Sequence, residues 1–310
     1  RLEVFPYPGF TRRAKGNWWA PYQALIRQAR RLRRQRYDLA VILRFDHWWA
    51  GLLAYLAGIP RRIGYDTDPL RLFLTERIPY TGIAHEVERN LTLIDHALAQ
   101  AGRRPAGAVG EFPALVYRAD DAERQSAATL LAEQEGEPGR PLVVIHPGAG
   151  AAVKEWPAER FAAVADALIR EAGVRVVLTG APADLGRAWQ VVAHMREDAR
   201  VLAGRTSAGQ LGAVLERSAL VIGSDSGPLH LAVAVGAPSL HLYGPVAPAT
   251  FGPWSATPER HSVLMADCPC APCNRLDFAP ADLPAHRCME TISVEQVLAT
   301  AKAMLAAGRL

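Results

Sequence analysis

The 310-residue chain lacks the features that mark membrane-spanning and exported proteins. No uninterrupted apolar run approaches the roughly 18 residues that a membrane-spanning helix requires. The first residues, Arg1 to Phe5, carry no signal-peptide pattern and predict the interior of a strand. Because the chain does not start with Met and starts inside an element, we expect a sequence that begins within its first domain.

Cysteine is scarce. Four cysteines in a chain of this length do not make a disulfide framework, so the sequence predicts a reducing, cytoplasmic compartment. They cluster as Cys268, Cys270 and Cys273, followed by Cys288. Four thiolates suffice for a tetrahedral zinc site, although the spacing is irregular for a zinc ribbon. Two interpretations stay open: a structural zinc site, or thiols that are buried or paired and hold no metal.

Acidic residues are scarce in the first part of the chain. Residues 1–118 hold 19 Lys and Arg against 10 Asp and Glu, whereas the remaining residues hold 16 against 21. The densest basic run, residues 27–36, is either a solvated helix face or a contact with an anionic membrane surface or an acidic acceptor. No stacking aromatics or recognition-helix pattern accompany this run, so a nucleic-acid partner is not expected.

Internal repeats and low-complexity tracts are absent, and strand and helix patterns alternate instead. This alternation predicts an α/β fold with parallel sheets covered by helices. A Pro-, Gly- and Ala-rich stretch, residues 102–113, predicts a linker. We expect two Rossmann-like domains, residues 1–118 and 119–310, the second ending in a helix. The expected strands are 39–44, 61–65, 141–146, 174–179, 201–202, 219–222 and 239–243, and the expected helices are 18–35, 47–57, 85–101, 119–134, 157–172, 182–195, 207–217, 229–235 and 293–307.

The most informative segment is residues 219–244. An apolar strand stops at a small polar loop, Gly-Ser-Asp-Ser-Gly at residues 223–227, and Pro228 opens a helix. A second apolar strand follows this helix. Loops at such positions bind ligands in open parallel sheets, and helix N-termini attract phosphate.

This loop is compatible with two kinds of chemistry. The spacing Gly223-x-Asp225-x-Gly227 fits the nucleophile elbow of an α/β-hydrolase with Asp in place of Ser. Alternatively, Ser226 and Gly227 donate hydrogen bonds to a diphosphate at the helix N-terminus, and Asp225 orients donors or a sugar. In that case His230 either points back to the loop or simply packs.

Three upstream loops also follow strand ends. Residues 146–157 combine glycines, which admit phosphate, with Lys154, but match neither a Walker A loop nor a dinucleotide fingerprint, and an ordinary tight turn is the alternative. In the second loop, Asp184 caps a helix or accepts hydrogen bonds from a ligand. In the third, Ser207 and Gln210 form a capping box, and Thr206 and Ser207 also suit a ligand edge. Four such loops at one sheet edge favour a nucleotide-diphosphate pocket over a hydrolase elbow.

The order of these motifs resembles glycosyltransferase family 9, the ADP-heptose:lipopolysaccharide heptosyltransferases and their relatives. The resemblance rests on His-Pro-Gly-Ala…Lys-x-Trp-Pro, Thr-Gly…Asp, Gly-x-Thr-Ser…Leu, Asp-Ser-Gly-Pro-x-His-Leu-Ala and Tyr-Gly-Pro, all within residues 140–255. It is looser upstream, at residues 37–39, 62–65 and 85–91. The resemblance implies the GT-B fold, in which two Rossmann-like domains face a cleft.

The resemblance also implies a nucleotide-sugar donor site in the second domain. By position, Lys154 is similar to the family's phosphate-binding lysine, Asp184 to an acid near the ribose or base, and Thr206 to a nucleotide contact. Lys154 and the helix N-terminus would stabilise the charge of the leaving diphosphate, and no metal or cofactor is required. The expected donor-binding residues are His146, Gly148, Lys154, Asp184, Thr206, Ser207, Asp225, Ser226, Gly227 and His230.

The sequence departs from the family in two places. The family's N-terminal loop, which carries the proposed general base, is not found, so we expect an incomplete N-terminal domain that lacks roughly two βα units. The general base is therefore unassigned, and Asp46 is a substitute candidate, with a helix cap as the alternative. Ala149 and Gly150 also stand where some relatives carry hydroxyl residues.

The expected function is an inverting glycosyltransferase. It would move a heptose-like sugar from a nucleotide diphosphate donor, such as ADP-heptose, to a cell-envelope glycolipid such as the lipopolysaccharide core. The alternative is a sugar-nucleotide-binding protein with little or no transfer activity, in keeping with the missing loop. The basic first domain would face the anionic acceptor, and the protein would be cytoplasmic, with peripheral contact at the inner membrane surface.

Overall fold

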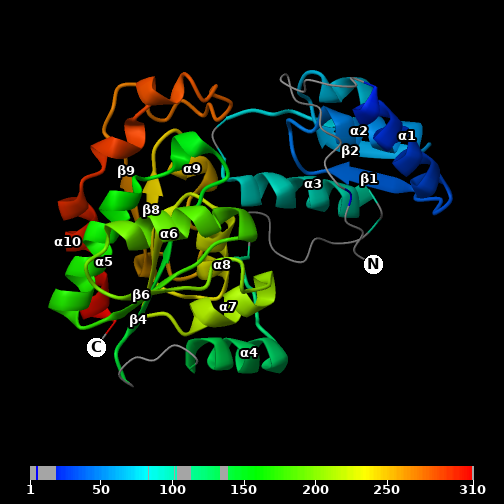
Figure 1. The fold of residues 1–310 in the computed structure, drawn as a ribbon. Coiled ribbons are helices and arrows are strands. Elements are labelled where there is room, and N and C mark those ends of the chain that lie inside the picture. Colours follow the sequence, from blue (N-terminus) through cyan, green and yellow to red (C-terminus); the bar gives the residue numbers. More distant parts are fainter. Residues whose placement is uncertain are drawn as a thin grey trace. The chain divides into compact units, whose positions relative to one another are not determined.

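The computed structural model describes Phe5 and residues 19–82, 84–100, 102, 113–132 and 139–308. The chain divides into two compact units, Arg1–Phe112 and Pro113–Leu310, and Figure 1 labels many of the elements of each. The strand expected at residues 1–5 and the linker expected at 102–113 lie almost entirely outside the described residues.

The first unit contains a three-stranded parallel sheet in the order β1-β2-β3. Two helices, α1 and α2, pack on one face through apolar residues such as Leu25 and Leu53, and α3 packs on the other face against Ile63 and Tyr65. The elements are α1 (Ala20–Arg33), β1 (Leu39–Ile42), α2 (Trp48–Leu56), β2 (Arg61–Tyr65), the 3₁₀ turn η1 (Leu70–Phe73), β3 (Glu76–Ile78) and α3 (Glu86–Gln100).

The second unit contains a six-stranded parallel sheet in the order β6-β5-β4-β7-β8-β9. From β4 the chain first adds β5 and β6 on one side and then β7, β8 and β9 on the other. The point where the order reverses therefore lies between β4 and β7, and open sheets bind ligands outside the carboxyl ends of such strands. The strands are β4 (Leu142–His146), β5 (Arg175–Leu178), β6 (Ala199–Val201), β7 (Leu220–Ser224), β8 (Ser239–Tyr243) and β9 (His261–Met265).

Helices cover both faces of this sheet (Figure 1). Val143 and Ile145 of β4 join the core with α5, α6 and α10, whereas Leu142 and Val144 join the core with α4, α7 and α8. Since successive strand residues face opposite sides, burial on both faces explains why β4 is a continuous apolar run. The helices are α4 (Asp121–Ala132), α5 (Ala158–Ala172), α6 (Leu185–His194), α7 (Ala208–Glu216), α8 (Gly227–Ala234), α9 (Pro248–Phe251) and α10 (Val294–Ala307), with 3₁₀ turns η2 (Ala152–Lys154), η3 (Pro182–Asp184), η4 (Pro258–Arg260), η5 (Leu283–Ala285) and η6 (Cys288–Thr291).

The predicted alternation is confirmed, and the differences concern edge strands and element ends. Strands β3 and β9 were not expected, because Glu-Arg-Ile in β3 is mostly charged and β9 is only half-buried at the edge of its sheet. The helix expected at 182–195 is a 3₁₀ turn followed by α6. Among the described residues, no helix combines the length and the apolar character needed to cross a bilayer.

Candidate functional site

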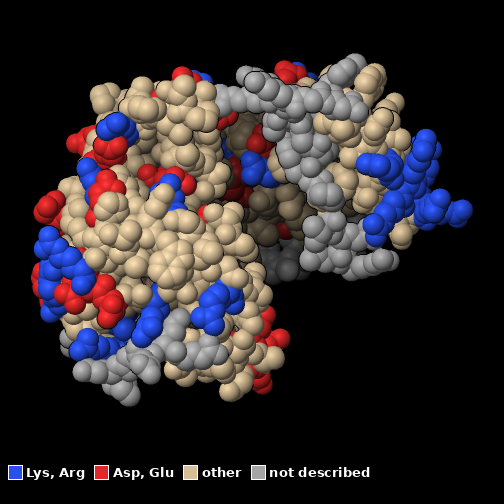
Figure 2. All heavy atoms as spheres, viewed as in Figure 1, with Lys and Arg blue, Asp and Glu red and all other residues tan. Residues whose placement is uncertain are grey.

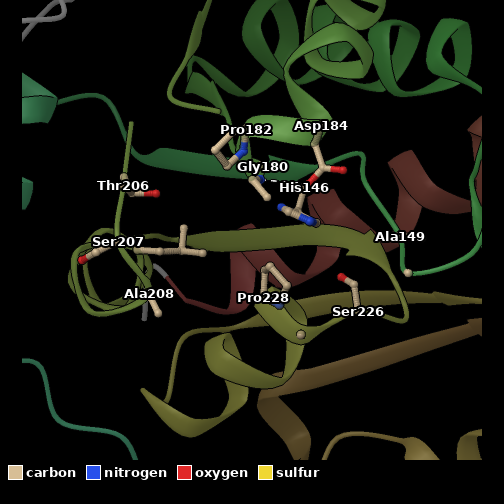
Figure 3. Close-up of a pocket in the computed structure, with 14 residues that line it drawn as sticks. His146, Ala149, Gly180, Pro182, Asp184, Thr206, Ser207, Ala208, Ser226 and Pro228 are labelled. Atoms are coloured by element: carbon tan, nitrogen blue, oxygen red, sulfur yellow. Dashed lines mark hydrogen bonds between the residues drawn. The ribbon is translucent and has the colours of Figure 1, made fainter. Parts of the chain in front are cut away.

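Loops after β4, β5, β6 and β7 together line one cavity of about 440 Å³ in the second unit (Figure 3). The cavity lies at the carboxyl edge of the sheet, where the strand order reverses. Most of the donor-binding residues expected from the sequence line it, whereas Gly148, Lys154, Asp225 and His230 lie outside its lining. The lining residues are His146, Ala149, Gly150, Gly180, Ala181, Pro182, Asp184, Thr206, Ser207, Ala208, Leu211, Ser226, Gly227 and Pro228.

Two glycines make room for the Asp184 carboxylate. A Cβ on Gly148 would lie 2.8 Å from Asp184 Cγ, and a Cβ on Gly180 would lie 2.7 Å from Asp184 Cβ. Asp184 makes no side-chain cap to α6; instead its Oδ2 accepts a hydrogen bond of 2.8 Å from the Ala181 amide. Figure 3 shows the carboxylate directed towards His146. The carboxylate is therefore held at the cavity wall by its own loop.

The N-terminus of α8 opens onto the cavity. Ser226 is the N-cap residue, but its side chain makes no cap bond, and among the described residues its buried Oγ has no hydrogen-bond partner. A Cβ on Gly227 would meet no atom within 4 Å, so space lies beside this backbone. Backbone N–H groups and the positive end of the helix dipole make this end of α8 suitable for an anion.

Ser207, unlike Ser226, caps the helix that it precedes. The Gln210 amide donates to Ser207 Oγ at 3.2 Å, and the Ser207 amide donates to Gln210 Oε1 at 2.9 Å. This confirms the predicted capping box at the start of α7. Thr206 and Ser207 also line the cavity, so the same turn serves as a helix cap and as a wall.

In the loop between β7 and α8, Asp225 lies between Lys154 and His230. Lys154 Nζ donates to Asp225 Oδ2 at 2.9 Å, and His230 Nε2 lies 3.3 Å from Asp225 Oδ1. Burial raises the pKa of Asp225, but the His230 hydrogen bond and the Lys154 charge outweigh burial and hold this pKa below its usual range. Both carboxylate oxygens are thus engaged, which disfavours Asp225 as a nucleophile. His230 points back to the loop rather than only packing.

His146 lies on the cavity wall and is 4% exposed. Its Nδ1 lies 3.2 Å from Thr179 Oγ1. Burial lowers the pKa of His146 to about 4, against an opposing effect of Asp184. The ring is therefore neutral near pH 7, so it can form hydrogen bonds with a ligand without adding charge.

The sequence analysis missed a buried polar row on β8. Ser239 Oγ lies 2.7 Å from His241 Nε2 and 2.8 Å from His261 Nδ1 on neighbouring β9. His241 is fully buried, and burial lowers its pKa to about 3. Tyr243, two residues further on, donates to the Phe251 carbonyl at 2.7 Å. The available signal was the period of two in Ser-Leu-His-Leu-Tyr, which places the polar residues on one face.

The two remaining candidate sites have the following geometry. Asp46, in the first unit, does not cap α2; it accepts bonds of 2.9 and 2.8 Å from Nε and Nη2 of Arg44. In the cysteine segment, Cys268 Sγ lies 3.5 Å from Cys270 Sγ, and Cys273 donates to the Arg275 carbonyl at 3.9 Å. Within the described ranges, no three His, Cys, Asp or Glu side chains are grouped closely enough to hold a metal ion.

Comparison with known proteins identifies relatives along most of the chain. The family model "Glycosyltransferase family 9 (heptosyltransferase)" matches residues 25–277. Lipopolysaccharide heptosyltransferase 3 of Escherichia coli is 30% identical over 237 residues, which are 72% of this chain and 64% of that protein. Lipopolysaccharide heptosyltransferase 1 of Pseudomonas aeruginosa is 29% identical over 274 residues, 86% of this chain and 70% of that protein. The chain thus spans less than two thirds of the Escherichia coli relative.

Solved structures agree with the fold. The Escherichia coli ADP-heptose lipopolysaccharide heptosyltransferase II superimposes with a TM-score of 0.71 at 23% identity, covering 93% of this chain and 82% of that one. A family 9 glycosyltransferase from Veillonella parvula gives a TM-score of 0.71 at 24% identity, covering 94% and 81%. The expected α/β fold of GT-B type is confirmed, and the incompleteness of the first domain stays a prediction.

Proposed function

The chain belongs to glycosyltransferase family 9, and from that premise we propose that it transfers a heptose-like sugar from ADP-heptose, or a related nucleotide sugar, to a lipopolysaccharide-type acceptor. The observation that carries the donor part of this proposal is the cavity at the reversal point of the second sheet. Four loops supply glycines, hydroxyls, a carboxylate and a helix N-terminus to one space, which suits a nucleoside diphosphate and exceeds the needs of a single nucleophile.

In this proposal the diphosphate lies at the N-terminus of α8. The buried Oγ of Ser226, which has no partner in the described part of the chain, and the open space at Gly227 support that placement. The nucleoside extends along the wall formed by Asp184 and Thr206. A buried hydroxyl without a partner is costly for the protein alone, and a ligand oxygen would satisfy it.

The transfer step is a single displacement with inversion. A base takes the proton of the acceptor hydroxyl as its oxygen attacks the anomeric carbon, and the bond from that carbon to the diphosphate oxygen breaks. The electron pair of that bond stays on the diphosphate. The α8 N-terminus and Lys154, held in place by Asp225, stabilise the charge that develops there.

The general base stays unassigned in this proposal. Asp46 remains a candidate, but its bidentate contact with Arg44 counts against strong basicity. Burial raises the pKa of Asp46, and the Arg44 hydrogen bonds and charge outweigh burial and lower it. A carboxylate with a lowered pKa takes up a proton less readily.

The acceptor and the location follow from the charge distribution. The first 118 residues carry the excess of Lys and Arg, which suits an anionic, phosphate-bearing glycolipid. We place the protein in the cytoplasm at the inner membrane surface, where a dissolved nucleotide sugar and a membrane-embedded acceptor can meet.

Calorimetry with ADP, UDP and GDP tests the donor site, and a transfer assay with ADP-heptose and a lipopolysaccharide-core acceptor tests the reaction. We expect ADP to bind and ADP to be released only when donor and acceptor are both present. Binding of ADP without transfer would favour a sugar-nucleotide-binding protein. Absence of binding by all three nucleotides would contradict the donor site.

A matched pair of variants tests the cavity itself. Ser226→Ala removes a hydroxyl that lines the cavity, and Ser224→Ala removes one that is also buried without a partner among the described residues but lies outside the lining. We expect Ser226→Ala to raise the Kd for ADP roughly ten- to a hundredfold, since hydrogen bonds to charged groups contribute about 1.5–3 kcal/mol. Ser224→Ala should leave this Kd unchanged, and neither variant should lower the Tm.

A further inference from the structure

Helix α1 of the first unit has two faces of different chemistry. Leu25 and Ala29 are buried in the core that α1 shares with α2 and β1. At about 100° per residue, a stripe of positions that lie roughly a quarter turn to half a turn away from these two runs along one flank of the helix. Every residue of this stripe, called here the docking face, is exposed: Trp19, Gln23, Ile26, Arg27, Arg30 and Arg34.

The docking face carries three arginines and contains no acidic residue among its six members. No Asp or Glu occurs between Glu3 and Asp38 in the sequence. Figure 2 shows arginine side chains gathered over α1. Arg33, at the border of the face, differs because its Nη2 donates to the Leu56 carbonyl at 2.8 Å. The arginines of the docking face therefore add to one another as a positive field that extends outward from the helix.

Apolar side chains lie among these arginines. Trp19 is 52% exposed and Ile26 is 42% exposed, and the Trp19 ring lies 5.9 Å from that of Tyr22. A surface helix that combines arginines with an indole and a branched aliphatic side chain fits the interface of an anionic bilayer, where charges meet headgroups and apolar groups enter the acyl boundary. An acidic protein segment would satisfy the arginines but would leave Ile26 and Trp19 without a matching environment.

We propose that the docking face binds the surface of an anionic phospholipid bilayer. The inference deepens the proposed function, on which it rests for the presence of a lipid-borne acceptor at that surface. Attachment through α1 keeps the first unit at the membrane, and it requires neither a spanning helix nor a covalent lipid. The attraction is mainly electrostatic, because arginines outnumber apolar side chains on the face.

The test is co-sedimentation of the protein with vesicles of dioleoylphosphatidylglycerol and dioleoylphosphatidylcholine, without nucleotide sugar or acceptor. We expect binding that disappears with pure dioleoylphosphatidylcholine vesicles and weakens steeply with added salt. Arg27→Gln/Arg30→Gln/Arg34→Gln should lower the partition coefficient on the order of a hundredfold, since each arginine near the surface contributes about fivefold. The lysine triple, Arg27→Lys/Arg30→Lys/Arg34→Lys, should retain most of the binding.

A matched control removes equal charge from the second unit. Arg170, Arg196 and Arg217 are exposed there, and changing all three to Gln should leave vesicle binding within about threefold of wild type. Ile26→Ser should weaken binding by a factor that salt does not change, because it removes apolar contact only.

The proposal is overturned if the docking-face glutamine triple binds like wild type, if the control triple loses as much, or if a duplex oligonucleotide binds more tightly than the vesicles. If the glutamine triple has a lower Tm than the wild type, the proposal is judged from the wild-type protein alone. Wild-type binding that does not depend on anionic lipid and on salt then overturns it. The vesicles contain no donor or acceptor, so a failure to bind them does not contradict the proposed nucleotide binding and sugar transfer. Likewise, a failure of nucleotide binding or transfer does not contradict the proposed membrane contact.

Discussion

The carboxyl edges of the two sheets both carry an acid–base pair, in opposite surroundings. In the second unit, Lys154 and Asp225 meet at 2.9 Å with side chains only 12% and 10% exposed. In the first unit, Arg44 and Asp46 meet at 2.8 Å with side chains 58% and 45% exposed. Both pairs lie in a loop between a strand and a helix, so we expect their contributions to stability to differ because of burial. A buried charge depends on its partner, whereas water can replace the partner of an exposed charge.

Asp225→Ala should have the largest effect on stability. It leaves the buried Lys154 charge without a partner and should lower the free energy of unfolding by about 3–5 kcal/mol in urea denaturation. Lys154→Met/Asp225→Ala should recover a large part of this loss, because no charge is then stranded. A loss below about 1 kcal/mol for Asp225→Ala would mean that this buried pair behaves like a surface pair.

Acid should destabilise the second unit through His146. Burial lowers its pKa from 6.5 to about 4 in the folded protein, so below pH 6.5 the unfolded chain binds a proton that the folded chain does not. The contribution of His146 to the free energy of unfolding is therefore fully present above pH 6.5. It is lost as the pH drops towards 4, which lowers this free energy by about 3 kcal/mol. The measurement is urea unfolding at a series of pH values.

The matched variants for this pH dependence are His146→Gln and His47→Gln. His146→Gln should reduce the dependence without abolishing it, because His241, whose pKa burial lowers to about 3, still contributes. His47→Gln, in the less buried setting of the first unit, should change the dependence less. Equal flattening by both variants would remove the contrast between the two edges.

Gly148→Ala should disturb the cavity wall at moderate cost. The new Cβ would lie 2.8 Å from Asp184 Cγ, so the carboxylate must move. We expect a stability loss of about 1–3 kcal/mol and a weaker affinity for ADP, measured by calorimetry. Gly150→Ala is the control for the stability loss in the same loop, because a Cβ there meets no protein atom within 4 Å. Similar losses in both variants would show that the loop backbone, rather than Asp184, is being disturbed.

Arg44→Gln should have the smallest effect. Breaking its exposed pair with Asp46 should cost less than about 1 kcal/mol, and added salt should reduce the cost further. Urea unfolding at low and high salt measures this. A cost comparable to that of Asp225→Ala would overturn the contrast between the edges.

Much of the fold could be predicted because its determinants are local. The apolar runs of β4 and β7 and the capping pair Ser207 and Gln210 act over a few residues. Gly173 and Gly236, with φ of 64° and 75°, follow α5 and α8 in the left-handed conformation that glycine adopts readily. The strands that escaped prediction, β3 and β9, owe their pairing to a neighbouring strand and carry little pattern of their own.

The amino-acid order alone was enough to predict two α/β units, the strand-end loops of the second unit and the resemblance to the family. Hydrophobic periodicity, helix caps and motifs each depend on residues that are close in sequence. The partner of Lys154, the engagement of both Asp225 oxygens and the lowered pKa of His146 came from the folded chain. Pairing and burial join residues far apart in sequence, and it is the parallel register of β4 with β7 that brings these loops together.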